Sequence, residues 1–345
     1  MKEICTFAVV GFGHIGRRHA TIINQHPGCK LVAVVDNSEQ AFKHELYPEG
    51  VPSFSTLSEM FRSGIRPDVV NIAAPNGYHC KLAVEALRHN AHVVIEKPMG
   101  LNKAECEDVI YTALHMSRQV FVVKQNRYSP PSRWLKEVVD SGALGENLMV
   151  QVNCYWNRDE RYYKVGGWKG TRTLDGGSLF TQFSHFIDIM YWIFGDIRNI
   201  QAMIRSFTHL DMTEFEDSGL VQFEFVNGGI GCINFSTSLW DTNMESSITV
   251  IGKNGSLKVG GQYMNEIEYC HIKDYVMPDL PPTNPPNDYG PFKGSAANHH
   301  YVIENVVNTL QGNDTITANA LEGLKVVDII ERIYQAASGF KKHIR

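Results

Sequence analysis

The sequence predicts an α/β protein with two domains, a doubly wound parallel sheet followed by a domain of antiparallel hairpins. Three observations lead to this prediction. The chain has 345 residues, which corresponds to about two domains at roughly 150 residues each. Its first part alternates apolar runs with stretches of helical spacing. Its second part contains closely spaced strand signals separated by turn residues.

The first domain is expected over residues 1–124. Apolar runs without alternation are typical of strands buried on both faces, as in a parallel sheet covered by helices. Such runs occur at 7–10, 31–35, 69–74, 92–95 and 120–123, and helical spacing occurs between them at 17–24, 57–63, 79–89 and 103–116.

The second domain is expected over residues 125–345. Helices are predicted at 131–140, 178–194, 299–310 and 320–337, and strands at 148–156, 200–207, 219–226, 230–239, 247–251 and 256–259. Asn319 and Glu322 form a capping signal at the start of the last helix. Turn signals such as Asn254-Gly255 predict antiparallel hairpins.

The composition excludes several classes of protein. Lys and Arg number 32 against 37 Asp and Glu, whereas binders of nucleic acid or anionic membranes need a basic face. No apolar run reaches the roughly 18 residues that a membrane span needs. The seven cysteines are scattered without a CxxC pair, which argues against a disulfide scaffold or a cysteine zinc site. A cytoplasmic protein without nucleic-acid or membrane partners is therefore expected.

The first chemical motif is GFGHIG at residues 11–16, between a predicted strand and a predicted helix. Its glycines allow a tight turn, close approach of a pyrophosphate to backbone N–H groups, and close packing of the helix. Asp36 ends the second predicted strand, where a carboxylate accepts hydrogen bonds from ribose hydroxyls and repels a 2′-phosphate. We therefore expect a Rossmann-type site that prefers NAD over NADP.

Two further motifs follow predicted parallel strands, at the edge where open sheets bind ligands. In the first, AAPN at 73–76 with His79, Asn76 contacts a ligand, caps the next helix, or does both. In the second, Glu96-Lys97-Pro98, the charges form a surface salt bridge, or Lys97 binds a hydroxyl that is being oxidised. To act as a base, Lys97 needs its ordinary pKa of about 10.4 lowered by burial or by cationic neighbours.

A fourth motif, at residues 175–188, places His185 and Asp188 on one face of a helix. A histidine on an apolar helix is more often a hydrogen-bonded core residue than a catalyst. No third ligand lies at a recognisable spacing, so no metal is expected. His299 and His300 are expected to be structural, with contact to a substrate as the alternative.

Together, these four motifs resemble the Gfo/Idh/MocA family of sugar oxidoreductases in order and spacing over essentially the whole chain. The resemblance implies an N-terminal Rossmann domain and a C-terminal α/β domain with a large, mostly antiparallel open sheet. That sheet is expected to serve both substrate binding and oligomer contacts. The resemblance also implies that Lys97 and His185 are catalytic.

Further segments are similar to the UDP-N-acetylglucosaminuronate 3-dehydrogenases of the WlbA/WbpB type: FVVKQNR at 121–127, GWKGT at 167–171 and SITVIG at 247–252. This similarity implies oxidation of the C3 hydroxyl of a UDP-sugar by NAD, in bacterial surface-polysaccharide (O-antigen) synthesis, by a homo-oligomer (dimer or tetramer). Many family members have Asp and Gly where this chain has Gln182 and Ser184. That departure places proton transfer mainly on Lys97 and disfavours a polyol substrate.

A UDP-uronate carries two phosphates and one carboxylate, which arginine binds well through bidentate contacts. Basic and aromatic residues gather between Arg158 and Arg172, among them Arg161, Tyr162 and Lys169. We expect this loop to hold the substrate. The alternative is an oligomer contact.

The motifs and the resemblance together define the expected site. The expected cofactor contacts are Gly11, Gly13, His14, Ile15, Gly16, Asp36, Asn37, Ala74, Asn76, His79, Glu96, Lys97 and Gln125. The expected substrate contacts are Asn126, Arg127, Tyr163, Trp168, Lys169, Arg172, Gln182 and His185. Two other functions stay open: a dehydrogenase of a free sugar or polyol, and a non-catalytic NAD-binding regulator, which the presence of both Lys97 and His185 disfavours.

Overall fold

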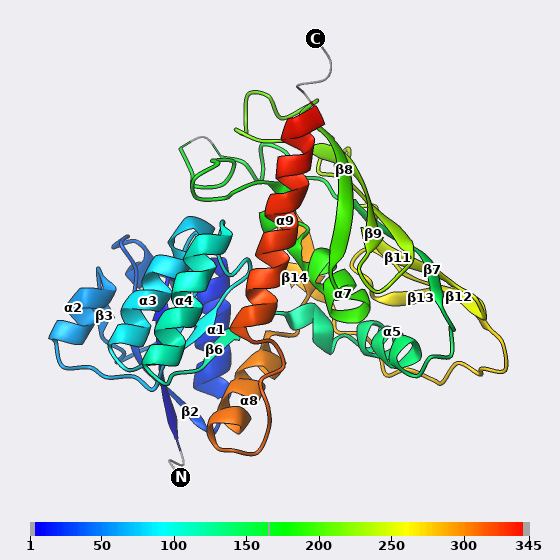
Figure 1. The fold of residues 1–345 in the computed structure, drawn as a ribbon. Helices are drawn as coiled ribbons and strands as arrows, with labels where there is room; N and C mark the ends of the chain where they lie inside the picture. The colour runs from blue at the N-terminus through cyan, green and yellow to red at the C-terminus, as the bar shows by residue number, and fades with distance from the viewer. Residues whose placement is uncertain (1–3, 165, 341–345) are drawn as a thin grey trace. The chain divides into compact units, whose positions relative to one another are not determined.

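The computed structural model describes residues 4–164 and 166–340, which divide into two compact units (Figure 1). The first unit combines the chain up to Lys124 with residues 299–327, and the second combines 125–298 with the chain from Asp328. The expected second domain includes all residues from 125 onward. Residues 299–327, however, group with the first unit. The reason is that helix α8 (His299–Leu310) packs against helix α1 (His14–Gln25).

Six parallel strands form the sheet of the first unit, in the order β3-β2-β1-β4-β5-β6. They are β1 (Cys5–Val10), β2 (Cys29–Val35), β3 (Ser53–Phe54), β4 (Val69–Ile72), β5 (His92–Ile95) and β6 (Val120–Val122). Every residue of β4 and β6 is buried, as the continuous apolar runs predicted. This strand order is that of the Rossmann fold, so the predicted doubly wound domain is confirmed.

Helices α2 (Leu57–Arg62), α3 (His79–Arg88) and α4 (Lys103–His115) lie beside one another over the sheet of the first unit (Figure 1). Helix α1 packs on β1 and β2 and on α8. Asn102 caps α4, because its side chain accepts a hydrogen bond from the backbone N–H of Glu105. The last helix, α9 (Ala320–Phe340), begins with the predicted reciprocal cap between Asn319 and Glu322.

A seven-stranded sheet forms the centre of the second unit, in the order β13-β12-β11-β7-β10-β9-β8. Its strands are β7 (Asn147–Tyr155), β8 (Ile197–Arg205), β9 (Ser218–Phe225), β10 (Ile230–Ser236), β11 (Glu245–Gly252), β12 (Gly255–Gly260) and β13 (Glu266–Ile272). Among the described residues of this sheet, only β7 and β10 pair in parallel, so the mostly antiparallel sheet is confirmed. Strand β13 was not predicted, nor was the small sheet of β14 (Pro286–Asp288) and β15 (Lys293–Ala296).

Helices α5 (Pro130–Asp140) and α7 (Ser184–Phe194) pack on the large sheet and on each other. The predicted helix at 178–194 is two helices, a short α6 (Ser178–Thr181) followed by α7. The backbone leaves the helix at Phe183, with φ −111° and ψ 0°, and this residue becomes the N-cap of α7. The break places His185 in the first turn of a helix.

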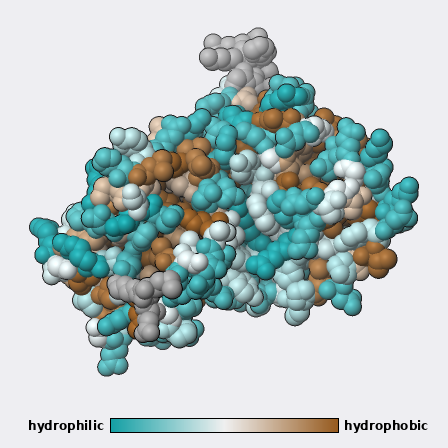
Figure 2. Space-filling model, turned by 60° about the horizontal axis from the view of Figure 1, so that its bottom comes forward, coloured by the Kyte–Doolittle hydropathy of each residue, from teal (hydrophilic) through white to brown (hydrophobic). Residues whose placement is uncertain are grey.

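The face of the molecule in Figure 2 mixes hydrophilic residues with hydrophobic patches. Within residues 4–164 and 166–340, no helix combines the length and the apolar character that a membrane crossing requires.

Candidate active site

The glycine-rich turn of the first unit joins β1 to α1. Gly11 has φ +86°, and a Cβ on Gly16 would lie 1.8 Å from the carbonyl oxygen of Gly11. Both positions therefore require glycine for the turn itself. A Cβ on Gly13 would meet nothing within 4 Å, and Gly13 is exposed. The turn thus leaves an open space at Gly13 beside the N-terminus of α1, which fits a bound pyrophosphate.

Asp36, which follows β2, connects to this turn. Its Oδ2 accepts a hydrogen bond of 2.6 Å from the backbone N–H of Phe12, and its Oδ1 accepts one of 2.8 Å from Ser38. The carboxylate is thereby fixed at the carboxyl end of β2, where it fits the ribose of a dinucleotide. Of the other predicted contacts, His14 and Asn37 are exposed and Ile15 is half-buried.

The His79 side chain contacts both segments that follow β4 and β5, at Ala74 and at Pro98. Its Nδ1 lies 2.7 Å from the carbonyl oxygen of Pro98, and its Nε2 lies 2.7 Å from that of Ala74. Burial lowers the pKa of His79, although both carbonyl contacts raise it. Asn76 is buried at the start of the short 3-10 helix η2 (Asn76–Tyr78), and the N-cap of α3 is Tyr78. The alternative in which Asn76 caps α3 is therefore wrong.

Glu96 is buried and Lys97 is half-buried. The Glu96 carboxylate accepts a hydrogen bond of 2.8 Å from His19 and another of 3.1 Å from the backbone N–H of Lys97. The alternative of a surface salt bridge is wrong, because Glu96 is only 6% exposed. His19 is a further residue of this site that the motifs did not include, although it follows Gly16 by three positions and so lies on the same face of α1.

In the second unit, the short 3-10 helix η3 (Gln125–Tyr128) packs against α7. Gln125 Nε2 lies 3.2 Å from His185 Nε2, and Arg127 makes a two-point ion pair with Asp188. His185 and Asp188 therefore share one helix face, as predicted. The Arg127 side chain is 1% exposed and its guanidinium binds Asp188, so its role as a substrate contact stays a prediction.

Buried polar atoms in this part of the second unit lack hydrogen bonds within the described residues. Both ends of the Asn126 amide have no partner, and neither does the Ser184 hydroxyl or Gln125 Oε1. Asn126 is 3% exposed, Ser184 0% and Gln125 2%. An orphaned buried donor or acceptor costs about 1–3 kcal/mol, so these groups fit a ligand that completes their hydrogen bonds.

The predicted substrate loop uses its arginines largely for its own structure. Arg158 is buried, donates a 2.7 Å hydrogen bond to Gln182 Oε1, and also binds the carbonyl oxygen of Lys293. Arg161 pairs with Asp159 and Asp241. Two of the arginines expected to bind the substrate, Arg158 and Arg161, therefore bind other groups of the second unit instead.

The other residues of the loop differ in exposure. Tyr163 is buried in a cluster with Tyr162 and Phe215, whereas Trp168 is half-buried. The Lys169 ammonium lies 3.7 Å from the centre of the Tyr162 ring. Arg172 donates a hydrogen bond to the carbonyl oxygen of Glu214 and lines a cavity of about 460 Å³.

Two family models match the chain. Residues 5–124 match the oxidoreductase family with an NAD-binding Rossmann fold, and residues 132–258 match the GFO/IDH/MocA C-terminal domain. The chain belongs to the Gfo/Idh/MocA family. As a member, it is an NAD-dependent sugar oxidoreductase, and its glycine turn and Asp36 are the parts that fit the cofactor.

Two solved structures are similar to this chain over nearly its whole length. The WlbA dehydrogenase from Bordetella pertussis, in complex with NADH and UDP-GlcNAcA, has a TM-score of 0.86 at 29% identity, with 97% of each chain covered. The WlbA enzyme from Chromobacterium violaceum, with the same ligands, has a TM-score of 0.87 at 28% identity, covering 98% of this chain and 94% of that one.

A curated relative is more distant. The D-glucoside 3-dehydrogenase of Escherichia coli is 23% identical, over 96% of this chain and 94% of its own length. The names of these relatives thus refer to different sugar substrates.

Proposed function

We propose that this chain oxidises the C3 hydroxyl of a UDP-linked N-acetylglucosaminuronate to a ketone, with NAD as the oxidant. One observation carries the proposal: the chain is 28–29% identical, over nearly its full length, to two WlbA dehydrogenases whose structures contain NADH and UDP-GlcNAcA. The D-glucoside 3-dehydrogenase of E. coli, which covers 96% of the chain, supports position 3 as the site of oxidation. The setting expected for this reaction is bacterial surface-polysaccharide synthesis in the cytoplasm.

The reaction breaks the C3–H bond and the O–H bond of one carbinol group and forms a C=O bond. When bound, NAD accepts the hydride. In our proposal Lys97 takes the hydroxyl proton, so the sugar loses two electrons and two hydrogens in total. Lys97 follows a strand end of the parallel sheet, the edge at which open α/β sheets bind ligands. His79 and Glu96 support this role, because they hold Pro98 and the backbone N–H of Lys97.

His185 is proposed as the second catalytic group, which orients the hydroxyl or relays its proton. Its position in the first turn of α7, beside Gln125, supports this assignment. A buried imidazole that is held by a neighbouring amide keeps a defined orientation, which proton transfer requires.

The proposed substrate contacts fall into two groups in the second unit. Asn126 and Ser184 offer buried hydrogen-bonding groups without partners among the described residues, which suits the hydroxyl and amide groups of a sugar. Lys169 and Arg172, which are only half-buried or exposed, suit the anionic groups of the substrate.

A second candidate is oxidation of a simpler sugar. It is favoured by the glucose-6-phosphate 3-dehydrogenase of Bacillus subtilis, which is 24% identical over 98% of this chain. It is also favoured by Arg158 and Arg161, whose internal contacts leave fewer positive charges for a diphosphate.

The test is NADH formation at 340 nm with one NAD equivalent per site, so that a single turnover is visible even if NADH stays bound. UDP-GlcNAcA should react, whereas glucose 6-phosphate, a D-glucoside and myo-inositol should react at least 100-fold more slowly. The reverse order would support the second candidate. NADH binding without turnover of any of these substrates would support a regulator instead.

We also propose that a second copy of the chain covers the open face of the seven-stranded sheet. Ile230 pairs with Met149, which pairs with Ile251, so the three side chains form a row across β10, β7 and β11. They are 56%, 38% and 40% exposed, respectively. A continuous apolar row on a sheet face is typical of a protein interface.

A further inference from the structure

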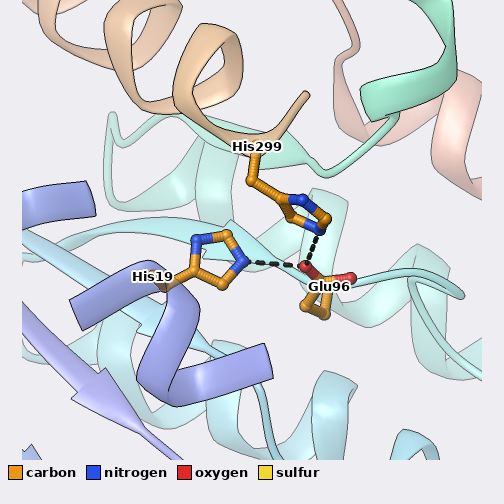
Figure 3. A group of neighbouring side chains, drawn as sticks. All are labelled: His19, Glu96 and His299. Atoms are coloured by element: carbon orange, nitrogen blue, oxygen red, sulfur yellow. Dashed lines mark hydrogen bonds and ion pairs between the residues drawn. The ribbon is translucent and has the colours of Figure 1, made fainter. Parts of the chain in front are cut away.

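Three buried side chains from three separate elements of the first unit meet at one carboxylate oxygen (Figure 3). His19 comes from α1, Glu96 follows β5, and His299 begins α8. His19 Nε2 lies 2.8 Å and His299 Nε2 lies 3.5 Å from Glu96 Oε1. The side chains are 0%, 8% and 1% exposed, so water does not compete for these contacts.

The protonation of this cluster follows from its geometry. A carboxylate only accepts hydrogen bonds, so each Nε2 that faces it carries the hydrogen. Burial raises the pKa of Glu96, but the hydrogen bonds from His19 and His299 outweigh burial and hold that pKa well below its usual value. Burial lowers the pKa of His299 to about 4. At neutral pH the cluster therefore contains an ionised Glu96 and a neutral His299.

The second oxygen of Glu96 leads to Lys97. Oε2 accepts a hydrogen bond of 3.1 Å from the backbone N–H of Lys97. On the other side of Lys97, the carbonyl oxygen of Pro98 lies 2.7 Å from His79. The main chain is thus held at Lys97 by Glu96 and at Pro98 by His79. Through its two oxygens, the Glu96 carboxylate connects His19 and His299 to the backbone of Lys97.

The same three residues have the composition of a metal site, with ligand atoms within 4.8 Å of one another. The Nδ1 atoms of the two histidines, which point away from Glu96, argue against metal binding. A metal-bound histidine almost always donates its other N–H to an acceptor, but Nδ1 of both His19 and His299 lacks a hydrogen-bond partner within the described residues. With the hydrogen on Nε2, each Nδ1 is an unprotonated lone pair, and no donor is left buried without an acceptor.

We propose that His19 and His299 are positioning residues, which keep Glu96 oriented so that it fixes the main chain of Lys97. This inference rests on the proposed function, in which Lys97 takes the substrate proton. Losing a histidine leaves the buried carboxylate short of a donor, so the carboxylate turns away or takes up a proton. In either case Lys97 loses its fixed position, while the cofactor turn at Gly13 is not part of the cluster.

The test compares His19→Leu and His299→Leu with His19→Gln and His299→Gln, in which the amide keeps an N–H near the place of Nε2. We expect the single-turnover rate with UDP-GlcNAcA to fall at least tenfold in the leucine variants and to recover at least half of its value in the glutamine variants. KM for the sugar and Kd for NADH should stay within twofold. The exposed His115 of α4, changed to Leu, is the control and should behave as wild type.

The outcomes separate this inference from the proposed function. Normal rates in the leucine variants, with Lys97→Met inactive, would overturn the positioning role and leave the proposed function intact. An active Lys97→Met enzyme would instead overturn the proposed function. A loss of NADH binding equal to the loss of rate would show a general structural role and would also overturn the inference.

Two further measurements test the inference even if a leucine variant does not fold. Glu96→Gln keeps the shape of the side chain but not its charge, and we expect the same tenfold loss of rate with NADH binding retained. Nitrogen-15 NMR of the wild-type protein at pH 7 should show the Nε2–H tautomer for His19 and His299. A stoichiometric metal in the purified protein, or the other tautomer, would overturn the assignment.

Discussion

Arg127 and Asp188 form a buried two-point ion pair, with Nε 2.9 Å from Oδ2 and Nη2 2.8 Å from Oδ1. The pair joins η3 to α7 and so fixes two elements that carry proposed substrate contacts, Asn126 and His185. The Trp192 ring also lies 5.2 Å from the Arg127 guanidinium. Arg127 is therefore part of the framework of the second unit.

We expect Asp188→Ala to destabilise the second unit by about 3–5 kcal/mol, because it leaves the Arg127 guanidinium buried without its partner. Urea unfolding followed by circular dichroism measures the change. The matched control is Glu224→Ala, which removes the exposed partner of Arg198 and should cost less than about 1 kcal/mol. Similar losses for both variants would contradict the structural role of the buried pair.

Two substitutions in the glycine turn should have different effects, one on cofactor binding and the other on folding. Gly13 has φ −71° and open space at its Cβ position, so Gly13→Ala should fold with unchanged Tm but bind NADH at least tenfold more weakly, because the methyl group occupies the space for the pyrophosphate. Gly16→Ala should instead lower Tm strongly, since its Cβ would collide with Gly11. Fluorescence titration with NADH and thermal unfolding distinguish the two. Unchanged NADH affinity in Gly13→Ala would contradict the assigned site.

Lys97→Met should leave NADH binding nearly unchanged and lower the single-turnover rate by about 10²–10⁴-fold, the range typical of general acid–base catalysis. The substitution keeps the length of the side chain but removes its proton-accepting amine. His185→Asn should lose less if His185 only orients or relays, and about as much if it is the base. Rapid-mixing absorbance at 340 nm with UDP-GlcNAcA gives both rates.

Glu216 should give the second unit a distinct pH dependence. Burial raises its pKa to about 7, although Tyr334 and the backbone of Ser178 donate hydrogen bonds to it. A carboxyl whose folded pKa is raised favours folding in its protonated form. That contribution is complete below about pH 4.5 and is lost as pH rises through 7.

Glu216→Gln should therefore remove part of the fall in stability between pH 5 and pH 8. We expect the stability difference between variant and wild type to change by up to about 3 kcal/mol over that interval, from 1.36 kcal/mol per pKa unit. Thermal unfolding at half-unit steps of pH measures it. Parallel pH curves for the two proteins would show that Glu216 does not titrate in this range.

The proposed interface can be tested by charge. Ile230→Glu should reduce the mass measured by light scattering to that of one 38.8 kDa chain, because a carboxylate would be buried in an apolar row. Leu114→Glu, on α4, changes an exposed leucine outside the sheet and should leave the mass unchanged. A wild-type protein of 38.8 kDa would overturn the oligomer proposal.

The sequence predicts most of the fold because its signals are local. Continuous apolar runs identify five of the six parallel strands, all except the two-residue β3, and the predicted bounds of α8 match the structure at both ends. Strand β13 gives a weaker signal, because it is an edge strand in which only Ile272 is buried, so it contributes no apolar run to the core. The break between α6 and α7 is also invisible locally, since Phe183 is apolar and packs against Trp156 and Phe235.

The candidate site is less predictable than the fold. Glycine spacing and Asp36 are short-range patterns, so the cofactor turn could be read directly. The His19–Glu96 contact spans 77 positions, and nothing in the sequence pairs these residues. For Arg158 the sequence suggests the wrong role. An arginine in a polar loop is expected to be available to a ligand, but the guanidinium of Arg158 donates hydrogen bonds to Gln182 and to the carbonyl oxygen of Lys293.

The division of the chain affects the order in which it folds during synthesis. Because the first unit needs residues 299–327, the ribosome must make all of residues 125–298 before α8 can pack on α1. Domains usually fold one after another from the N-terminus as they emerge. Here the first unit is synthesised first, but its last segment is made only after the strands of the large sheet. The contact between Glu96 and His299 therefore forms only when synthesis of the chain is nearly complete.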